Sequence, residues 1–476
     1  MRKTKIVCTL GPATEDPALI RSMILSGMDV ARLNFSHNTH EDHLRRIEVI
    51  KELRKELQRP VAILLDTKGP EIRLRNFKNG KVTVVEGQTF TLTTENIDGD
   101  HTTAAITYPK LPSEVSIGDR ILIDDGKIHL EVTNTTDTQI GCRVLHGGVL
   151  SNHKSINIPN IRLSLPYLSE QDKLDLLFGI EQDVDFIAAS FTRCKEDVIA
   201  LRKFLDYNGG HSIRIIAKIE NMEGVENFDD ILRHSDGIMV ARGDMGVEIE
   251  YEKLPGLQKR FIRRCYQSGK MVITATQMLE SMVTNPTPTR AEITDVANAV
   301  FDGTSAIMLS GETAAGQFPL ESVRVMAKIA EQAEEDARLL NTNRSIPYDM
   351  DASDTTNAVC DAACTTARDI KANAIIALTK YGETARRMSK FRPDVAIVAA
   401  TPVEKTFHQL ALSWGVYPVL ARYQQTSDEL FVHAIDCAKQ IDVVQNGDRV
   451  VIVAGVPLDT SGSTNLLKVE IVGKIQ

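Results

Sequence analysis

The sequence predicts a closed (β/α)₈ barrel that is interrupted by a small all-β domain and followed by a doubly wound α/β domain. Eight short apolar runs, each ending in polar residues, recur through the first 313 residues, and stretches with helical periodicity separate most of them. Runs without in/out alternation are typical of parallel strands that are covered on both faces. Eight strand–helix units favour a barrel over its structural alternative, an open doubly wound sheet.

The barrel elements follow one another in order along the chain. The apolar runs are 5–11, 29–36, 61–67, 184–191, 213–220, 236–244, 271–277 and 305–312. The segments with helical periodicity are 16–26, 40–57, 169–181, 195–207, 226–233, 252–268 and 291–301. The gap between the third and fourth runs is far too long for a βα connection, so it predicts an insertion.

The inserted segment has a different sequence pattern from the barrel. Residues 70–166 contain short β-rich pieces between Gly, Asp and Asn turns, which is typical of a small barrel or sandwich. We therefore assign residues 1–69 and 167–344 to the barrel and residues 70–166 to a β domain. A domain with two connections to its host can hinge, so it is expected to act as a lid.

A third domain is expected over residues 345–476. Helical patterns at 355–369, 382–391, 404–413 and 427–441 alternate with apolar runs at 374–379, 395–401, 416–421, 449–455 and 466–473. This alternation predicts the doubly wound α/β domain. No GxGxxG motif follows a strand there, so a dinucleotide site has little support.

Composition excludes several classes of protein. The chain has 476 residues and a net charge of −9, which makes it a poor candidate for binding nucleic acid or an anionic membrane. It has no stretch approaching the ~20 apolar residues of a membrane span. Its seven cysteines form no CxxC pair and no zinc spacing, so we expect buried thiols in a reducing cytoplasm.

Polar residues stand at the predicted strand ends, where barrel enzymes carry their function. They are Arg32, Asn34, Ser36, Asp66, Thr67, Lys218, Glu220, Arg242, Gly243, Asp244, Thr276, Gln277, Ser310 and Glu312. Lys218 and Glu220 share one face of a strand because side chains alternate. A charged pair pointing into the barrel costs several kcal/mol unless it is paired or binds something. A purely structural Lys–Glu pair is the alternative.

These residue types suggest phosphoryl chemistry at a divalent metal. Glu220 and Asp244 offer the hard oxygen ligands that Mg²⁺ prefers. Lys218 beside them can neutralise charge on a transferring phosphoryl group. The oxygens of Asn34, Ser36, Asp66 and Thr67 suit a weakly bound monovalent cation, and they suit simple hydrogen bonding equally well.

The chain resembles the pyruvate kinases at these residues. The segments are TKIVCTLGPAT (4–14), ARLNFSH (31–37), LLDTKGPEIR (64–73), KIEN (218–221), DGIMVARGDMGVEI (236–249), ITATQMLESM (273–282), PTPTRAEITDVANAVFDGTSAIMLSGETAAGQFP (286–319) and GSTN (462–465). As a set they are highly specific. The resemblance is to the bacterial type without an extra C-terminal phosphohistidine-like domain. It implies transfer of a phosphoryl group from phosphoenolpyruvate to ADP, giving ATP and pyruvate.

The resemblance also implies roles for single residues. Arg32, Lys218 and Thr276 would be catalytic, and Arg32, Lys218, Gly243, Asp244 and Thr276 would bind phosphoenolpyruvate. Glu220 and Asp244 would hold Mg²⁺ or Mn²⁺, and Asn34, Ser36, Asp66 and Thr67 would hold K⁺. Asn34, His37, Arg73 and Lys154 would contact the nucleotide. Glu71 favours potassium dependence, since family members with lysine there tend not to need it. A homotetramer is expected on the same basis.

The last domain is expected to sense a phosphorylated effector. The resemblance places this effector at Thr379, Tyr381, Gly382, Glu383 and Thr384, at the start of a predicted helix where N–H groups favour anions. The charge of Glu383 would repel a phosphate, and an ordinary turn is the alternative. Fructose bisphosphate, AMP and another sugar phosphate stay open as activators.

Two other functions compete with phosphoryl transfer. A carbon–carbon lyase would use a metal on Glu220 and Asp244 to stabilise an enolate, but it gives no reason for Lys218, Lys154 or the lid. A non-catalytic metabolite-binding protein predicts the loss of at least one rim residue, and none is lost. The sequence does not identify the proton donor to the enolate.

Overall fold

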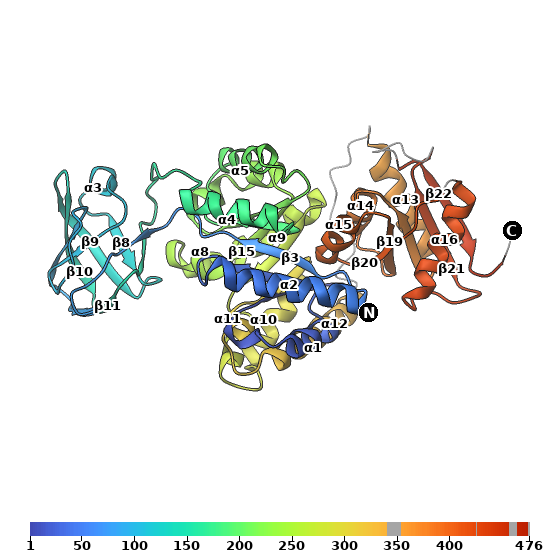
Figure 1. The fold of residues 1–476 in the computed structure, drawn as a ribbon, viewed down its shortest axis with the longest axis horizontal. Helices are drawn as coiled ribbons and strands as arrows, with labels where there is room; N and C mark the ends of the chain where they lie inside the picture. The colour runs from blue at the N-terminus through green and yellow to red at the C-terminus, as the bar shows by residue number, and fades with distance from the viewer. Residues whose placement is uncertain (340–353, 425, 457–463, 475–476) are drawn as a thin grey trace.

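The structure is a computed structural model that describes residues 1–339, 354–424, 426–456 and 464–474. Three bodies follow one another along the long axis: a β domain, a central barrel and an α/β domain (Figure 1). The predicted boundary at 344/345 and the first two residues of the GSTN segment lie outside the described residues.

The central body is the predicted closed barrel, in which eight parallel strands run in the order β1-β17-β16-β15-β14-β13-β3-β2. The strands are β1 Lys5–Thr9, β2 Val30–Asn34, β3 Ala62–Asp66, β13 Phe186–Ala189, β14 Arg214–Ile219, β15 Gly237–Ala241, β16 Met271–Ala275 and β17 Ala306–Leu309. The helices that follow them are α1 Pro17–Ser26, α2 His40–Leu57, α4 Glu170–Glu181, α5 Lys195–Tyr207, α7 Phe228–His234, α9 Leu254–Ser268, α10 Arg290–Phe301 and α12 Pro319–Leu339. Shorter helices α6 Met222–Glu226, α8 Arg242–Glu248 and α11 Gly311–Ala314 lie at the strand ends.

Local chemistry fixes where several barrel helices begin. Thr39, Ser169 and Thr289 each start a helix with a capping box, in which the hydroxyl accepts the N3 amide hydrogen and the N3 carboxylate returns the bond. The strands are buried along their whole length apart from their ends, because helices cover them outside and apolar side chains fill the barrel inside.

The interior of the barrel sets the direction of the site residues. Val30, Leu64, Phe186 and Ile216 belong to the apolar cluster that fills the barrel. The inward side chain two residues further along each of these strands stands one layer nearer the carboxyl end.

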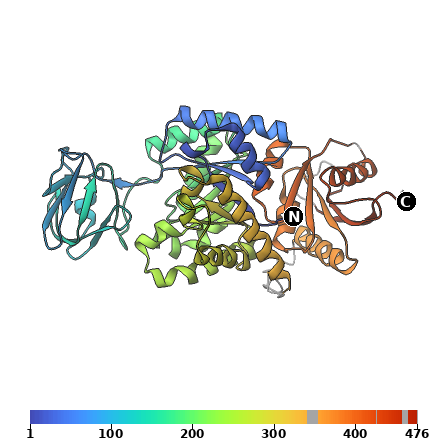
Figure 2. The ribbon, with the colours of Figure 1, turned by 90° about the horizontal axis from the view of Figure 1, so that it is seen from below.

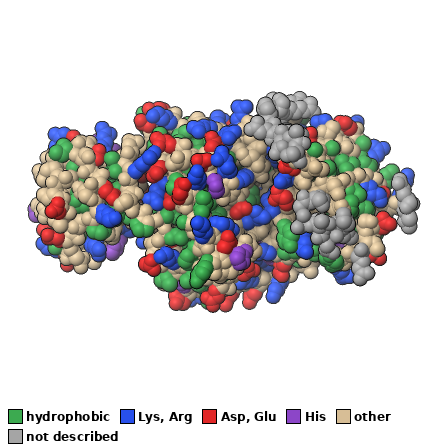
Figure 3. Space-filling model, turned by 90° about the horizontal axis from the view of Figure 1, so that it is seen from above, with side chains coloured by type: hydrophobic (Ala, Val, Ile, Leu, Met, Phe, Trp, Pro, Cys, Tyr) green, Lys and Arg blue, Asp and Glu red, His purple; other side chains and the backbone are tan. Residues whose placement is uncertain are grey.

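The inserted body is an all-β domain between β3 and α4. Seven strands form one sheet in the order β4-β12-β8-β9-β10-β6-β7, and β11 pairs with β5. The strands are β4 Ile72–Arg73, β5 Lys81–Val84, β6 Thr89–Thr93, β7 Thr103–Ala105, β8 Arg120–Ile123, β9 Ile128–Thr135, β10 Gln139–His146, β11 Gly148–Ser151 and β12 Ser155–Asn157, with the short helix α3 Leu111–Glu114. A narrow neck joins this domain to the barrel (Figures 2 and 3).

The third body is the predicted doubly wound domain with one antiparallel edge. Its sheet order is β20-β19-β18-β21-β22, and only β22 runs antiparallel to its neighbour. The strands are β18 Ala374–Leu378, β19 Ala396–Thr401, β20 Val416–Leu420, β21 Arg449–Ala454 and β22 Leu466–Ile471. Helices α13 Thr355–Asp369 and α14 Glu383–Lys390 pack in one apolar cluster, and α16 Ser427–Gln440 packs in the other, so both faces are covered.

The α/β domain docks under the amino ends of the barrel strands. Ala411 and Leu412 join the apolar cluster inside the barrel. Lys5 at the start of β1 donates from Nζ to the Val416 carbonyl at 2.7 Å, and Tyr417 donates to the Arg2 carbonyl at 2.8 Å. The opposite, carboxyl end of the barrel is therefore left to the β domain. No described helix is long and apolar enough to cross a membrane.

Candidate active site

A buried lysine stands at the carboxyl end of the barrel among oxygen ligands. Lys218 Nζ lies 3.0 Å from Asp66 Oδ1, 2.8 Å from Ser190 Oγ and 2.8 Å from Glu220 Oε1. These side chains meet because Lys218, Asp66 and Ser190 each follow an inward apolar residue of their strand by two positions. We call Arg32, Asp66, Ser190, Lys218 and Glu220 the Lys218 cluster.

A second cation completes this cluster. Arg32 Nε lies 2.6 Å from Asp66 Oδ2, and Arg32 Nη1 donates to Thr9 Oγ1 at 2.9 Å. Burial alone would raise the pKa of Asp66, but the charges of Arg32 and Lys218 outweigh it and hold that pKa below its usual value. Burial opposes the charge of Lys218 as well, yet Asp66 and Glu220 raise the pKa of Lys218. The Lys218 ammonium is therefore charged at neutral pH.

The two predicted magnesium ligands, Glu220 and Asp244, are buried carboxyl groups that lie close together. Burial raises the pKa of Glu220 to about 7 against the opposing charge of Lys218, and the charge of Asp244 raises it further. Burial also raises the pKa of Asp244. Two buried carboxyl groups this close favour a bound cation, and their hard oxygens are the ligands that Mg²⁺ takes. The donor set thus fits the predicted metal, although no group of three or more His, Cys, Asp or Glu ligands occurs among the described residues.

The turn after β16 places a hydroxyl beside the start of α8. Thr276 Oγ1 accepts the Gly243 amide hydrogen at 2.8 Å and donates to the Ala275 carbonyl at 2.7 Å. Thr276 and Gln277 both have positive φ, at 66° and 54°. Arg242 holds this strained turn by donating to the Thr276 carbonyl at 2.6 Å, while Asp295 anchors the same guanidinium at 2.7 Å. The structure thus brings Gly243, Asp244 and Thr276 together, as the sequence order of β15 and β16 suggests.

The predicted potassium ligands lie around the ends of β2 and β3. Asn34 and Asp66 are register partners in the barrel, and Asn34 Oδ1 accepts the Ser36 amide hydrogen at 3.1 Å. Thr67 Oγ1 accepts the Ser190 amide hydrogen at 3.1 Å. All four residues present oxygen atoms, but Asp66 already binds both cations of the Lys218 cluster.

The predicted nucleotide residues are split between the barrel and the β domain. His37 is exposed after β2, and its carbonyl accepts from His43 Nε2 at 3.0 Å. Arg73 and Lys154 lie beside each other at the neck, since β4 pairs with β12. Arg73 forms an ion pair with Glu71 at 2.7 Å, and Lys154 forms one with Asp124 at 2.8 Å. In the described part of the chain neither cation forms a hydrogen bond or an ion pair with Asn34 or His37.

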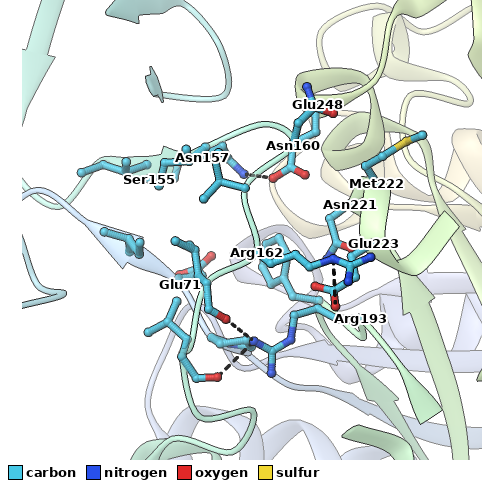
Figure 4. Close-up of a pocket in the computed structure, with 18 of the residues that line it drawn as sticks. Glu71, Ser155, Asn157, Asn160, Arg162, Arg193, Asn221, Met222, Glu223 and Glu248 are labelled. Atoms are coloured by element: carbon cyan, nitrogen blue, oxygen red, sulfur yellow. Dashed lines mark hydrogen bonds and ion pairs between the residues drawn. The ribbon is translucent and has the colours of Figure 1, made fainter. Parts of the chain in front are cut away.

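A cavity of about 250 Å³ occupies the neck between the β domain and the barrel (Figure 4). Asn157 of β12 donates to Glu248 of α8 across it at 3.3 Å, and burial raises the pKa of Glu248 to about 7. Phe191 also lines the cavity, and its amide hydrogen bonds to Glu220. The neck cavity therefore borders the Lys218 cluster.

The loop that precedes α14 is tied to its own helix. Thr379 Oγ1 accepts the Gly382 amide hydrogen at 2.9 Å, and Gly382 has φ 81°, a backbone conformation that favours glycine. Thr384 Oγ1 lies 2.8 Å from Thr464 Oγ1, whereas Tyr381 is 55% exposed. Burial would raise the pKa of Glu383, but Arg387 at 2.8 Å holds it low. Its charge is thus neutralised within the helix.

Sequence reasoning missed some contributors to the site. Ser190 and Thr9 were not singled out, although both follow an inward apolar residue by two positions, and that spacing could have found them. Glu312, which stood among the rim residues, is wholly buried and accepts the amide hydrogens of Leu279 and Ser310 at 3.0 and 2.7 Å. Its role is to hold the loops after β16 and β17.

Comparisons with known proteins agree with this geometry. Residues 1–323 match the family model described as pyruvate kinase, barrel domain, and residues 357–470 match the model described as pyruvate kinase, alpha/beta domain. A pyruvate kinase of Clostridium acetobutylicum is 47% identical over 475 residues, covering 99% of this chain and 100% of that protein. A pyruvate kinase of Geobacillus stearothermophilus is 48% identical over 480 residues, covering 100% of this chain and 81% of that protein. The crystal structure of a pyruvate kinase from Cryptosporidium parvum superposes with a TM-score of 0.91 at 40% identity, covering 99% of this chain and 96% of that one.

A (β/α)₈ barrel with an inserted β domain and a buried ammonium beside two carboxylates, together with these matches, defines a phosphotransferase. The chain belongs to the pyruvate kinase family. The predicted fold class and enzyme class are thereby confirmed.

Proposed function

We propose that this chain transfers the phosphoryl group of phosphoenolpyruvate to ADP, giving ATP and pyruvate in the last step of glycolysis. The observation that carries the proposal is the Lys218 ammonium, which Asp66 and Glu220 hold at 3.0 and 2.8 Å in the mouth of the barrel. Phosphoryl transfer needs positioning and charge neutralisation more than covalent help from the protein.

The cations of the Lys218 cluster neutralise the migrating group. Asp66 and Ser190 fix the ammonium in one place, and Asp66 and Thr9 fix the Arg32 guanidinium. Neither group must reorganise during the reaction, so their charges are already arranged for the transition state. Gly243, Asp244 and Thr276 bind the rest of phosphoenolpyruvate, and Thr276 helps to deliver the proton to the enolate through water.

Metal ions would add charge at the same place. Glu220 and Asp244 would hold Mg²⁺ or Mn²⁺, and Asn34, Ser36, Asp66 and Thr67 would hold K⁺. A divalent ion there supplies Lewis-acid stabilisation of phosphoryl and enolate oxygens. Glu71, paired with Arg73, supports potassium dependence through the family pattern.

The β domain serves as the lid over this site. We divide the chain into a barrel of residues 1–69 and 167–344, a lid of residues 70–166 and a regulatory domain of residues 345–476. Asn34 and His37 of the barrel and Arg73 and Lys154 of the lid bind the nucleotide when the lid closes. Closure excludes water, which competes with ADP as the phosphoryl acceptor.

Regulation and assembly follow the family pattern. A phosphorylated metabolite binds Thr379, Tyr381, Gly382, Glu383 and Thr384 and activates the enzyme, which assembles as a homotetramer in the cytoplasm. The neutralisation of Glu383 by Arg387 supports the effector site, because it removes the repulsion that this carboxylate would exert on a phosphate. All seven cysteines are free thiols, which suits a reducing compartment.

A coupled assay tests the proposal. ADP, phosphoenolpyruvate, Mg²⁺ and K⁺ are supplied, and pyruvate is followed through NADH oxidation by lactate dehydrogenase. Pyruvate formation that requires ADP supports the proposal. Pyruvate formed without ADP would indicate phosphoryl transfer to water, and no turnover would indicate a lyase with another substrate or a binding protein.

Potassium dependence is tested in the same assay. Replacing K⁺ by tetramethylammonium at constant ionic strength should sharply reduce turnover, because the larger ion does not fit among Asn34, Ser36, Asp66 and Thr67. Equal rates in the two salts would remove the potassium assignment and leave the phosphoryl transfer itself standing.

A further inference from the structure

A small cavity lies between the underside of the barrel and the α/β domain, at the opposite end of the barrel from the Lys218 cluster. Its volume is about 20 Å³. Lys270 comes from the barrel wall, and Arg386, Lys390 and Arg392 come from α14 and the turn after it. Four basic residues thus line the cavity, and among the described residues no acidic side chain lines it.

Arg392 lines this cavity and carries donor atoms without a partner. Its Nη2 donates to the Gly303 carbonyl of the barrel at 2.8 Å, but its Nε and Nη1 are buried without a hydrogen-bond partner. The guanidinium is held in place from two sides, 4.2 Å from the ring centre of Trp414 and 5.2 Å from that of Tyr266. A buried N–H group of a cation without a hydrogen-bond partner destabilises the folded protein, so a missing partner is indicated.

A second orphaned group lies in the wall of the same cavity. Ser413 Oγ is buried and has no hydrogen-bond partner. Neighbouring Ser389, by contrast, donates to the Trp414 carbonyl at 2.6 Å. Two residues that line this small space therefore carry three donor atoms without a partner, and a bound acceptor would satisfy such donors.

The local charge favours an anion over a neutral acceptor. Burial lowers the pKa of Arg392 to about 10 and that of Arg386 to about 9, so both remain cationic at neutral pH. No ion pair between Arg392 and a carboxylate occurs in the described part of the chain; Glu334 acts on it only through space. Lys270 donates to three barrel carbonyls, at 2.6, 2.9 and 2.7 Å, and forms no ion pair with any described carboxylate.

We propose that this interdomain cavity binds one halide-sized inorganic anion, chloride under physiological conditions. A space of about 20 Å³ holds one water-sized particle and is too small for a phosphate group. Chloride can accept a hydrogen bond from each of the three unpaired donors, and its negative charge suits the basic lining better than a neutral water molecule does. Arg392 and Ser413 of the α/β domain hold this anion, and Lys270 of the barrel wall lies beside it.

Bromide diffraction locates the site directly. Crystals of the full chain grown in bromide should show an anomalous peak between Arg392 and Ser413. Absence of the peak there, with bromide seen elsewhere in the same crystals, would overturn the proposal.

Thermal unfolding shows whether the anion stabilises the protein. Melting is followed as chloride replaces gluconate at constant K⁺, with a parallel series in phosphate. The wild-type Tm should rise saturably by about 2 °C in chloride, since a ligand that binds only the folded state stabilises it by mass action. Arg392→Met should lose this response, and so should Ser413→Ala, which keeps the charges if the first variant fails to fold.

Arg368→Met is the matched control, because Arg368 is an exposed arginine of the same domain that lies outside the cavity and forms an ion pair with neighbouring Asp369. It should keep the full chloride response. Equal responses of wild type and Ser413→Ala would contradict the proposal, and stabilisation by phosphate without stabilisation by chloride would overturn the halide assignment.

Discussion

At the scale of single residues, the chemistry depends on how Lys218 is held. The ammonium has three oxygen partners within 3.0 Å, and each comes from a different strand end or the residue just beyond it. Such a cage leaves the charge no freedom to move away from the reacting group. Most of its effect should therefore appear in the transition state and little of it in substrate binding.

Removal of that charge tests this view. Lys218→Met should lower turnover by at least ~10³-fold, equivalent to about 4 kcal/mol of barrier, with the KM for phosphoenolpyruvate changed little. Steady-state kinetics measure both values, with the exposed-lysine variant Lys203→Met as the control. Near-normal turnover of Lys218→Met would refute its catalytic role.

Ser190 should act as a positioning residue for the same ammonium. Its Oγ accepts from Lys218 at 2.8 Å and donates to the Thr67 carbonyl at 2.6 Å. Ser190→Ala should lower kcat about tenfold and leave KM almost unchanged, since a lost hydrogen bond to a charged group is worth about 1.5–3 kcal/mol. Ser235→Ala, at a buried serine beyond the other end of the strands, should keep its kcat. A change confined to stability in both variants would show that Ser190 serves folding alone.

At the scale of elements, α15 Glu404–Gln409 fastens the α/β domain to the barrel. Lys405 donates to the Val184 carbonyl at 2.7 Å, and Gln409 donates to the Ser212 carbonyl at 2.7 Å. Between them, His408 is 6% exposed. Burial lowers the pKa of His408 from 6.5 to about 4, helped by the charge of Arg54 and opposed by that of Asp185.

This histidine predicts acid sensitivity at the interface. The pKa of His408 is lower in the folded state than in the unfolded chain, so only the unfolded chain takes up the proton between pH 6.5 and about 4. The contribution of the neutral His408 to the free energy of unfolding is therefore complete above pH 6.5 and is lost as the pH falls toward about 4. Over this pH range the free energy of unfolding should fall by up to about 3 kcal/mol more in the wild type than in His408→Gln. Urea unfolding at several pH values measures this, with the exposed His211→Gln as control. Identical pH slopes for the wild type and His408→Gln would contradict it.

At the scale of the whole molecule, the barrel lies between a lid and a docked α/β domain (Figure 1). The two attachments differ in kind. The α/β domain places Leu412 in the apolar interior of the barrel, whereas the lid is joined by a neck that contains a cavity of about 250 Å³. Movement is therefore expected of the lid, and it should bring cations of the lid to the barrel rim.

A pair of lid lysines tests that movement. Lys154 and Lys127 both form ion pairs with Asp124, at 2.8 and 3.2 Å, but only Lys154 lies next to the neck strand β12. Lys154→Met should raise the KM for ADP about tenfold and leave that for phosphoenolpyruvate unchanged, as expected for one lost phosphate contact. Lys127→Met should change neither constant. The same increase in both variants would mean that the lid acts through its general charge.

Much of the barrel was predictable because its signals are local. Buried parallel strands must be apolar along their length, and capping residues such as Thr39 and Ser169 mark the helices that follow. Seven helices were expected, and the eighth, α12, was not among them, although it follows β17. The antiparallel direction of β22 was not predicted, since an edge strand carries no sequence signal for its direction.

The site was predictable only in part. Lys218, Glu220 and Asp244 stand out because charged residues at the end of apolar strands need a reason. Ser190 did not stand out, because serine at a strand end is common and its partners are 28 and 124 residues away. Glu312 looked like a rim acid until the structure showed its oxygens bonded to two backbone amides.

The sequence by itself determined the strand–helix alternation, the place of the insertion and the residue types at the barrel mouth, because these depend on local periodicity and on the cost of burying charge. Only the tertiary structure decided which of those residues touch. Barrel closure brings β2, β3, β13 and β14 into one ring, so that Arg32, Asp66, Ser190 and Lys218 share a single space. Domain docking likewise left Arg392 with buried donors, which no pattern along the chain could have shown.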